Sequence, residues 1–251
     1  MMKRRILPLV LSIVVLLFIW EIISIIGDFP VWQLPSPYVV GLELWRSWTS
    51  SEYLLHVRAT FIIACFGFIL SILVGVGVAV WLYFSTFLTR IVTPFLLFSQ
   101  NVPIIVLAPL LVVWFGFGIE AKLLVVILVC FFPITIALVD GFEQVDRNLL
   151  RYLEMSGATK WEKFRHLAFP SAVPVLFSSC KLSATYSVMG AVVAEWLGTE
   201  RGLGMIMTQA ANSFRTDRVF VSIITIVVLS GCFFFLISLV EQWWKHKRKL
   251  I

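Results

Sequence analysis

Six long apolar runs, separated by short polar stretches, dominate this 251-residue chain. They cover roughly residues 6–26, 60–84, 91–117, 121–140, 171–197 and 219–240. A helix needs about 20 apolar residues to cross a bilayer, so each run is long enough to span one. With 60% hydrophobic and 14% charged residues, the composition lies outside the range of soluble domains. The sequence therefore predicts an all-α integral membrane protein with six transmembrane helices in a single domain, residues 1–251.

The lysines and arginines predict the orientation of these spans. With the N-terminus inside, the cytoplasmic segments hold 13 of the 20 basic residues. The positive-inside rule then predicts a multi-pass protein of the cell membrane with both termini in the cytoplasm. The first run is longer than a signal-peptide core and no A-x-A site follows it, so we expect it to be a retained span. Because the basic residues collect at membrane edges, the net charge of +6 requires no nucleic-acid partner.

A polar segment, residues 146–170, interrupts the apolar pattern between the fourth and fifth runs. Leu149, Tyr152 and Leu153 recur at helical spacing and predict a short amphipathic helix. Gly157 follows them, and glycine is the residue that most readily ends a helix in the left-handed conformation.

A second short helix is predicted directly after this glycine. Thr159 and Glu162 form a capping box at its start. Trp161 and Phe164 then lie on one face, and we expect Pro170 to end the helix. The segment thus reads as a basic helical hairpin suited to docking on the cytoplasmic side.

Another short helix is expected on the extracellular side, after the first run. Ser36 can cap its N-terminus and Pro37 fits its first position. Its tyrosine and tryptophan side chains suit a helix lying in the membrane interface, through about Trp45.

The motifs of several chemistries are missing from the sequence. His56, His166 and His246 are isolated from one another, and the four cysteines stand singly, so no metal site is predicted. Paired carboxylates, a Ser/His arrangement and the phosphate-binding loop G-x-x-x-x-G-K-[ST] are also lacking. We therefore expect neither an enzyme nor a chain that binds ATP or another cofactor by itself.

The end of the polar segment resembles a known signature. Gly157, followed after nine residues by Leu167-Ala168-Phe169-Pro170, is similar to the end of the cytoplasmic motif of ABC-importer permeases, E-A-A-x3-G-x9-I-x-L-P. The front of the motif departs from the family, because Arg151-Tyr152-Leu153 stands where E-A-A is usual. A contact made by the family's glutamate is therefore not carried over, although Glu154 lies three residues further on.

The resemblance extends along nearly the whole chain to permeases of the nitrate/sulfonate/taurine type. It is carried by Leu34-Pro35-Ser36-Pro37, Pro103, Pro109, Trp114-Phe115-Gly116-Phe117-Gly118, Gly198 and Gly202-Leu203-Gly204. Within that group, residues 184–198 are similar to permeases for thiamine-pyrimidine precursors.

This resemblance implies a type I ABC importer permease fold with its core at about residues 56–240. It also implies a permease homodimer, two cytoplasmic ATPase subunits that hold ATP and magnesium, and an extracellular or periplasmic substrate-binding protein. Residues 146–170 would be the segment that couples the permease to the ATPase. The coupling residues would be Leu153, Glu154, Gly157, Ala158, Thr159, Trp161, Phe164 and Pro170. Candidates for the pathway or for docking of the binding protein are Tyr186, Glu195, Gly202 and Gly204.

Ionisable residues within spans are costly and mark functional positions. Lys181 is expected to extend its ammonium toward the cytoplasm along its flexible stem. Glu195 stands near the extracellular end of the fifth run. It is expected to lie at the interface, to stabilise the turn at residues 198–204, or to touch the binding protein.

Two alternatives remain open at this point. An ion-coupled secondary transporter would show inverted repeats and more intramembrane charges than Glu21, Lys181 and Glu195. For the cargo, a thiamine pyrimidine precursor is favoured over an alkanesulfonate, taurine or nitrate. An anion pathway would be expected to use a buried arginine, and no arginine falls within a span away from its ends.

Overall fold

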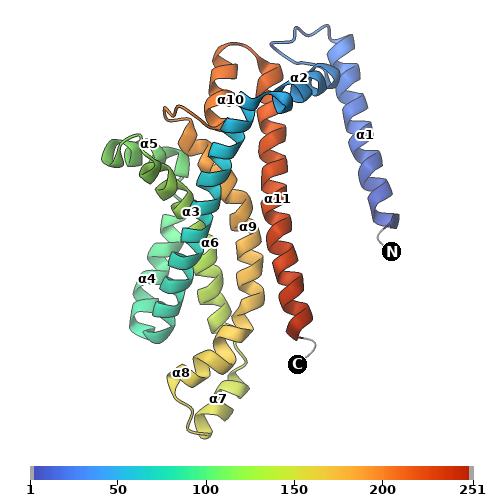
Figure 1. Ribbon diagram of the computed structural model, residues 1–251. Coiled ribbons are helices and arrows are strands. Elements are labelled where there is room, and N and C mark those ends of the chain that lie inside the picture. Colours follow the sequence, from blue (N-terminus) through green and yellow to red (C-terminus); the bar gives the residue numbers. More distant parts are fainter. Residues whose placement is uncertain (1–2, 249–251) are drawn as a thin grey trace.

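Four long helices, α3, α6, α9 and α11, run side by side through the molecule (Figure 1). The computed structural model describes residues 3–248, with the side chains of residues 8 and 10–247. The elements are α1 (Lys3–Ile26), α2 (Pro37–Thr49), α3 (Ser51–Phe84), α4 (Thr86–Ser99), α5 (Ile104–Phe115), α6 (Ile119–Glu143), α7 (Arg147–Met155), α8 (Lys160–Lys163), the π-helical turn η1 (Phe164–Ala168), α9 (Phe169–Glu195), α10 (Leu203–Asn212) and α11 (Thr216–Arg248). The described part of the chain holds no strand, which confirms the predicted all-α class.

Small residues allow the long helices to approach one another closely. A Cβ atom on Gly67 of α3 would lie 2.5 Å from the side chain of Val126 on α6. A Cβ on Gly190 of α9 would lie 3.4 Å from the backbone of the same Val126. Glycine at such contacts is typical of transmembrane interfaces, where close packing rather than water exclusion drives helix association. α6 is therefore held between α3 and α9, with Cys130 and Ile134 fully buried.

The number of continuous spans differs from the sequence prediction. Four helices are long and apolar enough to cross a membrane: α3, α6, α9 with its α8–η1 extension, and α11. The third predicted run, residues 91–117, is not one helix, because α4 and α5 meet at a bend of 100°. Pro103 lacks an N–H group and constrains the residue before it, and α5 begins directly after it. In α1, the described apolar part is the shorter Val10–Ile26.

The polar hairpin (residues 147–163) has the predicted local structure. Gly157 adopts a φ of 76°, and its neighbours form the paired hydrogen bonds of a Schellman motif: Ala158 N–H to Leu153 O, and Gly157 N–H to Glu154 O. Thr159 and Glu162 make the reciprocal bonds of the capping box.

The prediction that Pro170 ends the second short helix is wrong. The chain stays helical from α8 through η1 into α9, and Pro170 lies in the first turn of α9. In the π turn the Phe169 N–H donates to Phe164 O, five residues back. The π turn interrupts the regular i to i−4 hydrogen bonds of the helix just before Pro170. The helix can therefore accommodate Pro170, which has no backbone N–H to donate.

The two ends of the molecule carry different elements. α2 and α10 lie at one end, and α7 and α8 lie at the other (Figure 1). The N-terminal end of α1 and the C-terminal end of α11 both point toward the α7–α8 end (Figure 1). Among the basic residues used to predict orientation, Lys249 lies outside the described residues, as do the side chains of residues 3–5 and Arg248.

Candidate functional site

The polar hairpin presents an apolar face to the surroundings. Leu149, Tyr152 and Met155 of α7 and Trp161 of α8 are 50%, 64%, 82% and 56% exposed. Large apolar side chains gathered on one short hairpin mark an interaction surface when they are rimmed by polar residues. Arg147 and Arg151, on the same short helix, are exposed beside them. The hairpin is thus an exposed, basic and partly apolar surface.

Five aromatic rings fasten this hairpin to the long helices. The rings, here called the aromatic clasp, are Tyr83, Phe84, Phe142, Trp161 and Phe164. Phe164 is 6% exposed and its centroid lies 5.0 Å from that of Tyr83 and 5.7 Å from that of Phe142. Trp161 stacks on Phe84 at 6.0 Å. The clasp joins the start of the α8–η1–α9 helix to the ends of α3 and α6.

Lys160 adds a polar link at the same place. Its Nζ donates to the carbonyl oxygen of Phe84 at 2.8 Å, at the C-terminus of α3. Carbonyl groups in the last turn of a helix have no partner within the helix, and a cation stabilises them through the helix dipole. This bond attaches α8 directly to the end of α3.

The remaining predicted coupling residues hold the hairpin in shape. Glu154 forms an ion pair with Lys163 at 3.0 Å across the two short helices. Its carboxylate is half exposed, and exposed pairs contribute only about 0–1 kcal/mol, so the pair mainly orients the two helices. Leu153 and Ala158 are half-buried and linked by the Schellman hydrogen bond.

A second cluster lies at the opposite end of the bundle, at the start of α10. The side chains of His56, Thr60 and Glu195 accept the first three amide protons there. Gly202 N–H donates to His56 Nδ1 at 3.1 Å, Leu203 N–H to Thr60 Oγ1 at 2.9 Å, and Gly204 N–H to Glu195 Oε2 at 2.9 Å. We call these three side chains the amide cap.

Glu195 is the centre of this amide cap. It is 1% exposed and also accepts from Thr60 Oγ1 at 2.8 Å. A Cβ on Gly202, whose φ is 143°, would lie 2.1 Å from Glu195 Cδ, and one on Gly204 would lie 2.3 Å from Val192 O. Only glycine fits these two positions. Of the three expectations for Glu195, the geometry is that of a residue that stabilises the turn at 198–204.

Two of the three residues of the amide cap were not anticipated from the sequence. His56 and Thr60 lie on α3, more than 130 positions from the amides they bind. The local pattern of the sequence contains no signal for such a contact. The paired glycines after residue 198 were the available sign that a side chain approaches the backbone closely.

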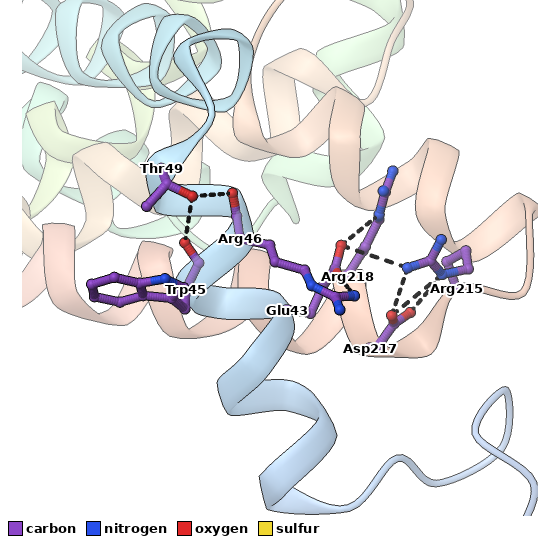
Figure 2. A network of polar contacts seen from close by, with 7 residues as sticks. All are labelled: Glu43, Trp45, Arg46, Thr49, Arg215, Asp217 and Arg218. Atoms are coloured by element: carbon purple, nitrogen blue, oxygen red, sulfur yellow. Dashed lines mark hydrogen bonds and ion pairs between the residues drawn. The ribbon is translucent and has the colours of Figure 1, made fainter.

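A charged network joins α2 to α11 near the same end (Figure 2). Arg218 Nε donates to Glu43 Oε1 at 2.9 Å, and Arg215 lies 3.5 Å from the same oxygen. Arg215 also bonds Asp217 at 2.7 Å, and this bond raises the pKa of its guanidinium. Beside the network is a hollow of about 450 Å³ lined by Glu43, Arg46 and His56 among others.

Lys181 has a partner that the sequence did not reveal. Its Nζ lies 2.8 Å from Glu241 Oε2, so the pair connects α9 to α11. Lys245 binds the other oxygen of Glu241 at 2.6 Å. A carboxylate between two ammonium groups avoids the large cost of an unpaired charge at membrane depth.

Tyr186 lies apart from the other three pathway or docking candidates. It borders a hollow of about 290 Å³ at the bend between α4 and α5, together with Gln100, Asn101 and Phe132. The structure therefore groups Glu195 with Gly202 and Gly204, and places Tyr186 in a separate hollow.

Residues 3–248 contain no group of three or more His, Cys, Asp or Glu side chains that could hold a metal ion.

Comparison with known proteins gives a consistent family. A family model described as "Binding-protein-dependent transport system inner membrane component" matches residues 71–246. The formylaminopyrimidine transport permease protein ThiX of Halalkalibacterium halodurans is 32% identical, over 95% of this chain and 96% of its own. The riboflavin transport system permease protein RibX of Chloroflexus aurantiacus is 31% identical, over 94% and 88%.

A third relative and a solved structure extend the comparison. The putative aliphatic sulfonates transport permease protein SsuC of Bacillus subtilis is 30% identical, over 91% of this chain and 81% of its own. An inward-facing structure of the MetNI methionine ABC transporter aligns with a TM-score of 0.54 at 18% identity, covering 82% of this chain and 98% of that one. At 18% identity, this structural likeness supports a shared fold for the two chains.

Proposed function

We propose that this chain, which belongs to the family of binding-protein-dependent transport system inner membrane components, carries a small organic solute across the cell membrane. Members of this family are ABC importer permeases. The chain would work together with cytoplasmic ATPase subunits and a substrate-binding protein. The observation that supports this assembly best is the polar hairpin. It exposes an apolar, basic face, and the aromatic clasp ties that face firmly to α3 and α6.

The mechanism follows from this attachment. The ATPase subunits bind ATP and magnesium, and their closure displaces the hairpin seated on them. Lys160 and the aromatic clasp pass the displacement to the end of α3, so the long helices move as rigid elements and access switches between the two sides of the membrane. The chain itself supplies the pore and the coupling surface.

We also propose that the permease works as a homodimer with both termini in the cytoplasm. α5 exposes Ile105, Val106, Val113 and Trp114, each more than half exposed in the single chain. In a membrane this apolar face of α5 has to be covered by lipid or by a second copy of the chain. If the transport pathway runs between two copies, an apolar face of this kind is needed beside the pathway, where the copies meet. The positive-inside count supports the orientation.

For the cargo, we propose a thiamine pyrimidine precursor before an aliphatic sulfonate. Relatives named for a formylaminopyrimidine, riboflavin and sulfonates are similar to this chain at 32%, 31% and 30% identity, so identity alone does not separate them. The sequence provides no arginine within a span away from its ends, whereas a fixed anion favours such a partner.

Purification of the chain with its genomic neighbours, followed by uptake assays in proteoliposomes, tests the function. We expect an ATPase to co-purify, and uptake to need ATP and the binding protein. A secondary transporter would instead import without ATP and lose uptake when a protonophore is added. Calorimetry of the cognate binding protein with a formylaminopyrimidine and with taurine then tests the cargo.

A further inference from the structure

The bend between α4 and α5 leaves non-helical backbone at membrane depth. The connecting residues, 100–103, face Leu128 and Phe132, which lie in the middle of the 25-residue α6. Backbone of this kind is stable in a membrane only where it is buried in protein or lines a water-filled cavity. Residues 100–103 all border the hollow of about 290 Å³, and Gln100 and Asn101 are exposed to it, which is the second of these two arrangements.

The side chains around this hollow have a distinct chemistry. Tyr186 from α9 and Phe132 from α6 provide aromatic rings, and Ser99, Gln100 and Asn101 provide a hydroxyl and two amides. Among the described residues that line the hollow, none is charged. Asn101 Nδ2 donates to Leu97 O at 2.9 Å, whereas the side chain of Gln100 makes no hydrogen bond to any described residue. A mostly apolar hollow with a few polar groups is the usual form of a small-molecule site.

We propose that this hollow is a contact site for the transported solute, and that it takes an uncharged, planar heteroaromatic ring. The ring stacks on Tyr186, and its nitrogen or carbonyl groups bond the free side-chain amide of Gln100. A sulfonate is disfavoured here because its fixed charge would enter a mainly apolar hollow that offers no cation. The proposal rests on the proposed importer function and adds a site and a chemical class to it.

Binding to the purified permease–ATPase complex, without the binding protein, tests the site directly. The probes are labelled formylaminopyrimidine and labelled taurine. We expect the wild-type complex to bind the pyrimidine, and Tyr186→Ala or Gln100→Leu to weaken this binding about tenfold each, as expected for loss of ring stacking or of a hydrogen bond. Tyr186→Phe retains the ring and should stay within about twofold of wild type.

Matched variants outside the hollow provide the controls. Tyr38→Ala changes a tyrosine on α2 that is 73% exposed, and Gln144→Leu changes an exposed glutamine after α6. Both should bind the pyrimidine as wild type does. If the two hollow variants bind as well as these controls, or if the wild-type complex binds no pyrimidine, the site is wrong.

Two further results separate the site from the function. If taurine binds to the wild-type complex and binds more weakly to the Tyr186→Ala and Gln100→Leu variants, the proposed heteroaromatic class of ligand is wrong. Proteoliposomes containing the ATPase and binding protein report the function independently. Wild-type vesicles that import neither probe with ATP overturn the proposed function for these cargoes, whereas ATP-driven uptake of the pyrimidine that is unchanged in both hollow variants overturns the site alone.

Discussion

Replacement of Glu195 should weaken the attachment of α10 in a graded way. In Glu195→Ala the Gly204 N–H loses its acceptor in a buried place, and the Thr60 hydroxyl loses its partner. An unsatisfied buried donor costs about 1–3 kcal/mol, and a typical intramolecular hydrogen bond contributes about 0.5–1.5 kcal/mol net. We therefore expect a loss of about 2–4 kcal/mol, the cost of one unsatisfied buried amide together with one lost hydrogen bond.

Glu195→Gln should be much milder. The amide has the same shape, its oxygen can accept from Gly204 N–H, and its NH₂ can donate to the Thr60 hydroxyl once that hydroxyl rotates. This change should cost about 1 kcal/mol, the net value of one hydrogen bond. For a chain of this size 1 kcal/mol corresponds to about 2–4 °C, so the alanine variant should melt roughly 10 °C below wild type.

Thermal unfolding of the detergent-purified protein, followed by aggregation or tryptophan fluorescence, provides the measurement. Glu200→Ala is the matched control, because Glu200 is exposed in the same loop and bonds none of the α10 amides. An alanine variant at 195 that melts within a degree of the control would refute the amide cap as a stabilising feature. Glu195→Gln should also retain binding-protein-stimulated ATPase activity, since it preserves the position of α10.

The other predictions concern the hairpin and the α9–α11 pair. Gly157→Val should leave expression near normal but uncouple ATP hydrolysis from transport, because a β-branched residue at a φ of 76° strains the turn. Gly41→Val, at an open helical position, is the control. Transport at the wild-type rate in Gly157→Val would contradict the turn assignment. Phe164→Ala should cost about 3–5 kcal/mol and loosen coupling, seen as a lower melting temperature and more ATP hydrolysed per solute. Lys181→Met should destabilise more than Lys181→Met with Glu241→Gln, because the single change leaves a carboxylate with one partner fewer; equal melting temperatures would exclude that coupling.

Local features of the fold could be predicted because their causes are local. Ser36 accepts from Val39 N–H as an N-cap, and the capping box at Thr159 forms from residues three positions apart. The left-handed Gly157 likewise follows from its own lack of a side chain. Such features depend on neighbours in sequence, so the amino acids alone specify them.

The errors arose where competing interactions decide the outcome. Pro170 normally ends a helix, but the π turn and the packing of Phe164 against α3 and α6 carry the helix past it. The run at 91–117 has the apolar length of one span, yet the sequence Asn101-Val102-Pro103 interrupts it. Hydropathy measures length and composition, and it does not report a bend whose polar residues line a cavity.

The contacts that organise the candidate sites lie far apart in sequence and meet on one helix. α3 is fastened near its start to α10, through His56 and Thr60, and at its end to the polar hairpin, through Phe84. These attachments are separated by 28 residues of unbroken helix, or about 42 Å at 1.5 Å per residue. A helix held at both ends cannot be displaced at one end without moving the other, because packed helices shift as rigid elements. We therefore expect movement of the hairpin to be transmitted along α3 to α10.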